Sequence, residues 1–432
     1  MSEIRNTADI MDAILAGQSV AKYTYTLVES EKQELNVENG NLKLMRTVFN
    51  NSCSLSVFDG SKKGAVNGND ITPEGLKKLV ANGKVAAESA DEDPCNDFAP
   101  DQGKDVFRYG VYEPDLDGFI ERVKEFLAAV AKEYPKVNLL NVVASFDRWN
   151  WLSRNTNGTE FEGFGGKYGF NIEISASEGD TTTGLDYTGI SMKDLNTPFI
   201  DLPGIRMHLE NVQNSIHPET LEGKFTGPVV FLPECAAEFI FTTLYNYTDS
   251  DVIIDGTSQW LDKVGEKVAH ESLTVSIKSS DERIVCGERA TQDGFRTEDA
   301  TIIDHGVLKA HMLNLYAANK TGRPVLKNTS GDLVVEPGDK TVEELIGSID
   351  KGLLLGGFSG GQPGANGEFS GVAKNSFLIE NGKIKCAVTE TMVNGNLGEI
   401  VRNIRGISKE QYCDGGFVVP YIAVDGIVIS GK

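Results

Sequence analysis

Asparagine–glycine pairs between stretches of alternating polar and apolar residues constrain the fold of this chain more than any other feature. They occur at Asn39-Gly40, Asn157-Gly158 and Asn381-Gly382. Asn and Gly tolerate the positive φ angles of the tight turns that join adjacent antiparallel strands, so each pair predicts a β-hairpin. Sheets built from hairpins are antiparallel. We therefore expect an α+β protein and not a doubly wound parallel sheet.

Helices are expected on both sides of the first two hairpins. Apolar residues recur at helical spacing over residues 72–90 and 115–134, which is the pattern of an amphipathic helix. The order helix, antiparallel strands, helix extends over about 7–90 and recurs over about 115–215. We therefore expect an N-terminal α+β domain, residues 1–220, with a weak internal duplication.

Most of the other elements that the sequence predicts are strands. In the first unit, strand-like stretches lie at residues 23–30, at 34–45 around the hairpin turn Asn39-Gly40, and at 53–60. Beyond residue 220 alternating segments prevail, so residues 221–432 are expected to form a second domain of mostly antiparallel β-structure with few helices. Two helices are expected in this domain, at residues 233–245 and 341–351.

The composition excludes several classes of function. The 432 residues include 63 acidic and 41 basic side chains, a net charge of −22. Phosphate backbones and anionic membranes repel so acidic a surface, so neither is an expected partner. Six scattered cysteines without a CxxC pair are typical of reduced thiols in a cytosolic protein. The start of the chain lacks an apolar signal, and we expect a cytoplasmic location.

The stretch "GPVVFLPECAAEFIFTTL" raises the main question about function. Pro233 suits the first position of a helix, and Glu234 in the first turn is favoured by the helix dipole. Glu238 follows one turn later on the same face, where like charges repel each other. Two carboxylates on an otherwise apolar helix indicate either a buried cavity with an occupant or the remains of a site.

Histidines give weaker signals. His270-Glu271 could be half of a zinc-binding HExxH motif, but the second histidine is absent and the stretch continues as a strand. His305 and His311 could lie on one face of a strand pair, although no third ligand is evident. All three are interpreted as ordinary polar or core residues.

A glycine-dense segment, residues 356–371, resembles a phosphate loop only in composition. A phosphate loop leads into a helix, whereas here an alternating segment follows and the Walker lysine is absent. We expect either an irregular loop or a strand edge that another backbone can approach. The residues proposed to form a peptide-binding edge are Gly356, Gly357, Phe358, Ser359, Gly360 and Gly361.

Three long motifs between residues 294 and 404 point to a family. They include "DHGVLKAHMLNLYAANKTG", "VVEPGDKTVEELIGSIDKGLLLGGFSGG" and "GEFSGVAKNSFLIENGKIKCAVTETMVNGNLGEIVRNI". In this order they closely resemble the C-terminal domain of the TldD/PmbA family, often labelled modulators of DNA gyrase. The resemblance extends more loosely over the N-terminal half. It implies a peptidase-like C-terminal domain.

The resemblance also implies one of two roles. The TldD branch resembles a zinc metallopeptidase in which an HExxxH helix supplies two histidine ligands and a glutamate base, with a cysteine as a further ligand. The PmbA/TldE branch lacks the histidines and serves as the partner subunit. On that motif, "PECAAE" places Pro233 and Glu238 at the histidine positions and Glu234 at the base position, while Cys413 matches the cysteine. Proline offers a metal no donor atom.

We therefore expect a non-catalytic PmbA/TldE-type subunit that holds no metal or cofactor and has no catalytic residue of its own. The expected partners are a TldD-like subunit that carries the zinc, a small or unfolded peptide and, as an alternative assembly, a second copy of the chain. One rival is a stand-alone hydrolase with an altered metal or thiol site at Glu234, Glu238, Cys413 and His311. The other rival is a binding module that modulates DNA gyrase or a toxin–antitoxin system.

Overall fold

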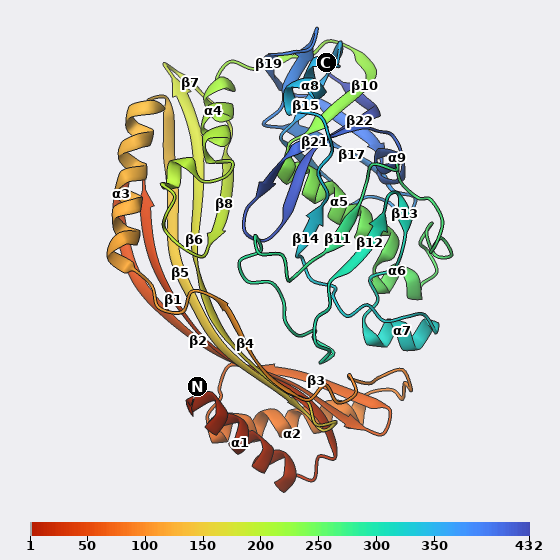
Figure 1. Ribbon diagram of the computed structural model, residues 1–432. Coiled ribbons are helices and arrows are strands. Elements are labelled where there is room, and N and C mark those ends of the chain that lie inside the picture. The colour runs from red at the N-terminus through yellow and green to blue at the C-terminus, as the bar shows by residue number, and fades with distance from the viewer. Residues whose placement is uncertain (1) are drawn as a thin grey trace.

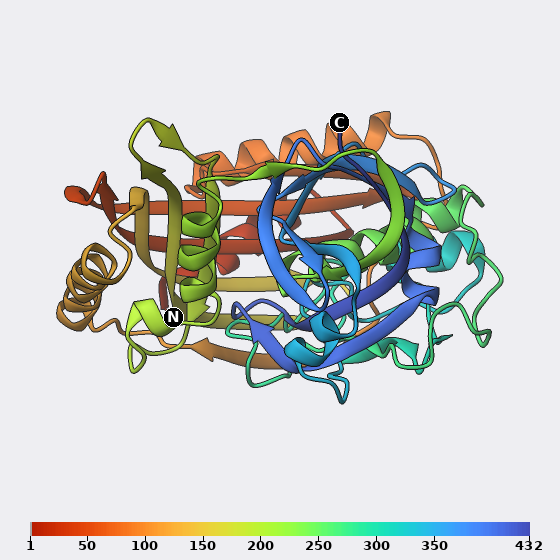
Figure 2. The ribbon, with the colours of Figure 1, turned by 90° about the horizontal axis from the view of Figure 1, so that it is seen from above.

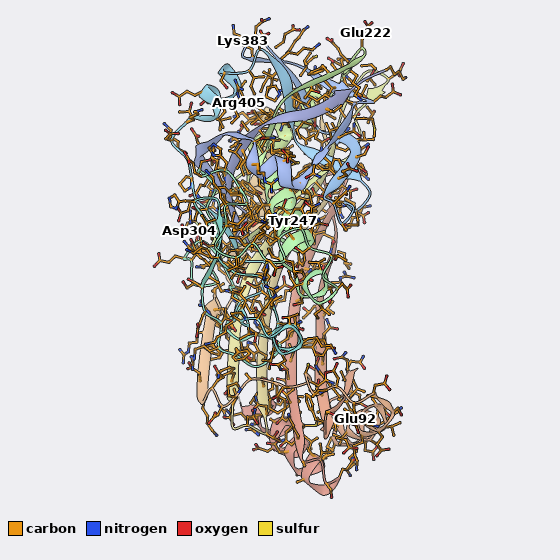
Figure 3. All side chains as sticks on the ribbon, turned by 90° about the vertical axis from the view of Figure 1, so that its right-hand side faces the viewer. Glu92, Glu222, Tyr247, Asp304, Lys383 and Arg405 are labelled. Atoms are coloured by element: carbon orange, nitrogen blue, oxygen red, sulfur yellow. The ribbon has the colours of Figure 1, made fainter. Side chains whose placement is uncertain are left out.

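The structure, a computed structural model, describes residues 2–432. Two β-sheets and the helices around them make up this part of the chain, so the protein is α+β as expected (Figure 1). Glu92 lies at the end of the molecule formed by α1 and α2, and Glu222 and Lys383 lie at the opposite end (Figure 3).

The N-terminal half contains one long, curved sheet. Its strands are β1 (Lys22–Glu38), β2 (Asn41–Asp59), β3 (Lys62–Gly68), β4 (Lys104–Gly110), β5 (Val137–Asn155), β6 (Glu160–Glu178), β7 (Thr181–Thr182) and β8 (Asp186–Met192). The order across the sheet is β3-β2-β1-β5-β6-β4, and β7 and β8 also pair with β6. The helical elements of this half are α1 (Ser2–Gly17), α2 (Pro73–Ser89), α3 (Leu116–Glu133), the 3-10 turn η1 (Phe199–Asp201) and α4 (Ile205–Asn214).

The hairpin predictions hold in this sheet. Asn39 and Gly40 have φ angles of 49° and 73°, and the turn they form joins β1 to β2 in antiparallel register. The helix expected at 72–90 is α2, whose first turn is capped by the Thr72 side chain. The strand-like stretches expected at 23–30, 34–45 and 53–60 lie in β1 and β2, but these two strands are continuous and longer than the separate stretches indicate.

One face of the long sheet is apolar and covered by helices. Tyr25 and Leu27 on β1 are buried with α1 and α2, and Leu35 and Val37 on the same strand are buried with α3 and α4. All four have odd numbers, and odd positions of a regular strand share a face. Figure 1 shows α1, α2 and α3 on the side of the sheet away from the C-terminal half, whereas α4 lies beside that half.

The C-terminal half is a second, larger sheet whose strands curve into a ring when seen from above (Figure 2). Its central path is β13-β12-β11-β14-β22-β10-β15-β18-β19-β9. The strands are β9 (Glu219–Thr220), β10 (Lys224–Phe231), β11 (Val275–Ile277), β12 (Ala300–Asp304), β13 (Val307–Leu308), β14 (Leu333–Val335), β15 (Lys351–Leu355), β16 (Gly357–Gly360), β17 (Glu368–Lys374), β18 (Phe377–Glu380), β19 (Lys383–Thr389), β20 (Met392–Asn396), β21 (Ile404–Cys413) and β22 (Val418–Ser430).

More helices accompany this sheet than the two we expected. They are α5 (Pro233–Thr248), α6 (Ser250–Ile254), α7 (Leu315–Thr321), α8 (Val342–Gly347) and α9 (Leu397–Arg402). The helix expected at 233–245 is α5, which lies in the largest apolar core through residues such as Phe239 and Tyr247. The one expected at 341–351 is the shorter α8, because the chain enters β15 at Lys351. No helix within residues 2–432 is both long and apolar enough to traverse a bilayer.

Candidate functional site

Helix α5 starts where the sequence predicted. Strand β10 ends at Phe231, Leu232 has an extended backbone, and Pro233 occupies the first helical turn. Leu232 offers no side-chain cap to this helix end. The exposed N–H dipoles of the first turn therefore favour a carboxylate, and Glu234 provides one.

Glu234 is bound by a buried histidine. The Nε2 atom of His208 donates to Glu234 Oε2 at 2.5 Å, and its Nδ1 atom donates to Asp186 Oδ2 at 2.8 Å. An imidazole ring with a carboxylate at each nitrogen binds both of them only when both nitrogens carry a proton. His208 is therefore an imidazolium between two carboxylates.

Neutral side chains complete the contacts. Thr188 Oγ1 and the Tyr412 hydroxyl donate to Glu234 Oε1 at 2.8 and 3.0 Å. Asn375 Nδ2 donates to Asp186 Oδ1 at 2.7 Å. We call this set the Glu234 network, which consists of Asp186, Thr188, His208, Glu234, Asn375 and Tyr412.

The Glu234 network joins the two halves of the molecule. Asp186 and Thr188 lie on β8 and His208 on α4, all in the N-terminal half, whereas Glu234 is in the first turn of α5 and Tyr412 lies on β21.

The charged groups of the Glu234 network stabilise one another. Burial alone would lower the pKa of His208, but Asp186 and Glu234 outweigh it and raise that pKa to about 10. Burial would raise the pKa of Glu234, but the bond from His208 lowers it overall.

His208 escaped the sequence analysis, although a signal was present. Ile205, His208, Leu209 and Val212 are the buried positions of α4, and they follow the spacing of one helical face. A histidine on such a face needs a buried partner. Asp186 and Thr188 likewise alternate on β8, but nothing local indicates that either faces the start of α5.

Glu238 does not share the environment of Glu234. Although the helix around it is buried, Glu238 is exposed and lines a hollow of about 230 Å³ together with Phe239, Phe358 and Ser359. Partial loss of hydration raises the pKa of Glu238. The expectation of two carboxylates at one cavity is therefore corrected, because Glu234 belongs to the network between the domains and Glu238 to the hollow.

The predicted glycine-rich edge borders this hollow. Residues 357–360 form strand β16, which within residues 2–432 pairs only with β17. Its other edge is free to accept a strand. Ser359, Gly360 and Gly361 line the hollow with Glu238, and Gly356 directly precedes β16 at the end of β15. The structure thus brings Glu238 and the segment from Gly356 to Gly361 to one place.

Cys413 lies apart from both carboxylates. Tyr412 points to Glu234, and because neighbouring strand residues face opposite sides, Cys413 points away. Its sulfur donates to the Arg283 carbonyl at 3.5 Å and accepts from the Gly415 N–H at 3.3 Å. Burial raises the pKa of this thiol.

The other histidines of the sequence analysis also lie apart. His311 is buried and its Nε2 donates to the Trp260 carbonyl at 3.0 Å. His305 contacts the adjacent Asp304, and His270 contacts Ser272. Within the described residues, no group of three or more His, Cys, Asp and Glu side chains could hold a metal ion.

Comparison with known proteins shows the family. The model of the PmbA/TldA metallopeptidase C-terminal domain matches residues 223–431, and that of PmbA/TldA metallopeptidase domain 1 matches residues 26–90. Together these matches cover more than half of the chain. This chain belongs to the PmbA/TldD family.

Individual members of the PmbA/TldD family resemble the chain over most of its length. Metalloprotease MJ0996 of Methanocaldococcus jannaschii is 22% identical over 88% of each chain. Metalloprotease PmbA of Escherichia coli O157:H7 is 23% identical over 82% of this chain and 80% of its own. The shorter match to a zinc metalloprotease TldD homolog of Saccharolobus solfataricus is 24% identical and covers 59% of this chain and 60% of the relative.

Solved structures of the family show the same fold. TldE of Thermococcus kodakarensis superimposes with a TM-score of 0.84 at 20% identity and covers 97% of this chain and 99% of its own. A protein of Bacteroides thetaiotaomicron described as a candidate modulator of DNA gyrase has the same TM-score at 23% identity, with full coverage of both chains.

The zinc that the name of the Saccharolobus solfataricus relative indicates does not fit the residues present here. Of the two residues that the sequence resemblance places at histidine positions, Pro233 has no donor atom and Glu238 lines the hollow beside β16. The Glu234 carboxylate already accepts three hydrogen bonds, and the Cys413 thiol points away from it. A catalytic zinc site needs three converging protein ligands, which these four positions do not provide.

Proposed function

We propose that this chain is the non-catalytic, PmbA/TldE-type subunit of a cytosolic metallopeptidase that processes small or unfolded peptides. In this proposal a TldD-like partner supplies the zinc and the catalytic residues. The chain described here contributes the scaffold, part of the enclosure and a contact surface for the peptide. Membership of a metallopeptidase family supports a role in proteolysis.

The observation that carries the proposal is the state of Glu234. A general base must be free to take a proton from an attacking water. Here the carboxylate that occupies the base position is bound to the His208 imidazolium and to two hydroxyls, and its pKa is lowered. A carboxylate with a lowered pKa and three donors is a weak base.

The free edge of β16 supports a contact with peptide. An extended peptide can add to such an edge through main-chain hydrogen bonds, which recognise any sequence in an extended conformation. The hollow beside it offers the rings of Phe239 and Phe358 and the carboxylate of Glu238. We propose that peptide lies along β16 with one side chain in this hollow.

Metal content and activity test the proposal. The purified chain, expressed with added zinc, should hold far less than one zinc per chain in elemental analysis and should not cleave an unfolded peptide. Mixed with a TldD-like chain that has an intact HExxxH motif, it should support cleavage. Replacing the glutamate of that partner's motif should abolish cleavage by the mixture.

The corresponding variant of this chain is Glu234→Gln, whose amide oxygen can still accept the hydrogen bonds from Thr188 and Tyr412. We expect the mixture with Glu234→Gln to retain activity, because Glu234 has a structural role. About one tightly held zinc per chain, with chelator-sensitive cleavage that Glu234→Gln abolishes, would instead establish the stand-alone hydrolase.

The rival sites have less support. A thiol enzyme needs a thiolate, and burial raises the pKa of Cys413. Direct action on DNA conflicts with the net charge of −22. A gyrase or antitoxin partner stays a separate hypothesis, and stoichiometric capture of either protein by the purified chain would establish it.

A further inference from the structure

A cleft of about 260 Å³ lies between the long sheet and the C-terminal half. Its sheet side includes Tyr109 on β4 and Trp149 and Trp151 on β5, and the facing side is the loop of residues 286–292 between β11 and β12. The cleft shares no residue with the Glu234 network or with the hollow beside β16. Ligand sites occur preferentially where two domains meet.

The sheet side of the cleft is an aromatic wall, formed by Tyr109, Trp149 and Trp151. The two tryptophans alternate with Asn150 on β5 and therefore project to the same side of the sheet. The ring of Tyr109 lies 6.1 Å from that of Trp149, and its hydroxyl accepts a hydrogen bond from Trp151 Nε1 at 3.1 Å. Gly163 on β6 lies opposite Trp151 and makes room for it, because a Cβ atom there would collide with the indole nitrogen. Both tryptophans are only half-buried, so their rings remain accessible to a ligand.

The facing loop carries a guanidinium without a carboxylate partner. Arg289 lines the cleft, and its guanidinium lies 5.9 Å from the centre of the Tyr109 ring. Within residues 2–432 it makes no ion pair, whereas Arg283 and Arg296, which lie nearby in the sequence, both do. A guanidinium offers paired N–H donors that match the two oxygens of a carboxylate. Arg289 is therefore available to an anion that enters the cleft.

Glu288 also lines the cleft but opposes an anion only weakly. Burial and the nearby Asp332 raise the pKa of Glu288 to about 7. Near neutral pH much of this carboxyl is therefore uncharged, and its O–H can then donate to a bound anion.

The backbone of the loop is fixed without a ligand. The main-chain N–H of Glu288 donates to Asp332 Oδ2 at 2.9 Å, and that of Thr297 donates to the Arg289 carbonyl at 3.1 Å. A site held in place in this way loses little conformational freedom when a ligand binds.

We propose that the cleft binds a small aromatic carboxylate, with its ring against the aromatic wall and its carboxylate on Arg289. Rings gain more from contact with other rings than aliphatic groups of the same area do. A cationic ligand would also be attracted by the rings, but Arg289 repels it. The volume lies below that of the sites for drug-sized ligands, about 300–1,000 Å³, which limits the ligand to about one ring and its acid group.

Two sources present these groups, a free aromatic acid and the C-terminal aromatic residue of a peptide. The inference concerns a site separate from β16 and is independent of the subunit role proposed above.

Isothermal titration calorimetry with the purified chain at pH 7 tests the ligand class. The anion 3-phenylpropionate should bind, whereas 3-phenylpropanamide and 3-phenylpropylamine keep the ring without the negative charge and should bind at least about tenfold more weakly. Hexanoate, which keeps the charge without the ring, should bind at least about threefold more weakly. Tighter binding of the peptide Gly-Gly-Phe than of 3-phenylpropionate assigns the cleft to peptide C-termini, and the reverse order assigns it to a free acid.

Variants test the geometry. Arg289→Gln should weaken the binding of 3-phenylpropionate at least about tenfold, and Arg289→Lys should give an intermediate affinity. Arg108→Gln is the matched control and should leave the affinity unchanged. Within residues 2–432, Arg108 likewise lies over a ring, that of Phe164, without an ion pair, but it does not line the cleft. Trp149→Ala should weaken binding, and Trp149→Phe, which keeps a ring, should largely restore it.

Glu288→Gln should bind 3-phenylpropionate at least as tightly as wild type, because its amide can donate as the protonated carboxyl does. The absence of saturable binding of 3-phenylpropionate, equal affinity for the acid and the amide, or an unchanged affinity in Arg289→Gln would each overturn the proposal. Tighter binding of the amine, lost in Glu288→Gln, would make the cleft a cation site and would overturn it as well.

Discussion

The sequence resemblance places Glu234 at the position of a catalytic glutamate, whereas its contacts in this structure are those of a structural residue. Its carboxylate faces His208, Thr188 and Tyr412, which come from a helix and strands of both domains. The network around it is fully hydrogen-bonded, and such buried networks contribute to stability only while every member has its partner.

Replacing His208 by alanine should destabilise the protein strongly. The substitution leaves Asp186 and Glu234 buried without their shared cation, and breaking a buried ion pair costs about 3–5 kcal/mol. Urea denaturation at pH 7 measures the loss. His217→Ala is the matched control, because His217 bonds a single carboxylate, Glu178, at the surface, and the change there should be small. Equal effects at both positions would contradict a structural role for the network.

The contribution of His208 to stability should depend on pH. An unfolded histidine titrates near 6.5, whereas the pKa of His208 in the fold is raised to about 10. A raised pKa stabilises the fold fully below pH 6.5, and the stabilisation is lost as pH rises toward 10. The difference in unfolding free energy between wild type and His208→Ala should therefore shrink over this range, by at most about 1.4 kcal/mol per pH unit. A constant difference from pH 6 to pH 9.5 would rule this out.

Of the six residues of the Glu234 network, the sequence indicated only Glu234. It was recognisable, together with the neighbouring Pro233, because a proline and an acid at the start of a helix obey local rules. Asp186, His208 and Asn375 were not, because their meeting depends on how β8 and α4 lie against the C-terminal domain. Periodicity shows that a side chain is buried, but not which distant residue it contacts.

At the scale of elements, the long strands depart most from the prediction. The middle of β1, residues 31–33, is polar and separates the two stretches that the sequence predicts as strands. It remains β because neighbouring strands supply partners, as Arg148 on β5 does for Glu31 at 2.5 Å and Arg46 on β2 for Glu34 at 2.8 Å. Cross-strand ion pairs of this kind become visible only when the register is known.

β16 provides a prediction at the same scale. An unfolded peptide should bind the purified chain or its complex, and methylation of alternate backbone nitrogens on the strand-facing side of the peptide should weaken binding about tenfold, because hydrogen bonds to the free edge are lost. Methylation of the intervening nitrogens is the control and should have little effect. Fluorescence anisotropy of labelled peptides measures both affinities. Equal affinity for the two methylated series would exclude strand addition.

At the scale of the whole molecule, β22 organises the C-terminal sheet. It pairs with β10, β14, β20 and β21, and residues such as Val424 are fully buried. The Asn-Gly turn at 381–382 was predictable from the sequence. The central place of β22, with four partner strands, was not, because hydrophobic alternation does not show how many neighbours a strand has.

Because β22 joins four other strands, substitutions at two adjacent positions of β22 should have unequal effects on stability. Val424→Asp places an unpaired carboxylate between β10 and β21 and should unfold the C-terminal domain. Asp425→Ala removes only a surface pair with Arg405 and should change stability little. The emission of Trp260, which is buried in this domain, reports the difference once Trp149 and Trp151 are replaced by phenylalanine. An unshifted Trp260 emission in Val424→Asp would show that β22 is not essential.

The position of β22 in the chain has a consequence for synthesis. Every strand that pairs with β22 precedes it, so a ribosome releases all of its neighbours before the strand that joins them. The C-terminal sheet must then close after residue 430 has left the exit tunnel, and until that moment the edges of β10 and β21 stay open to other chains. We therefore expect chaperones to bind the nascent chain until β22 has been released.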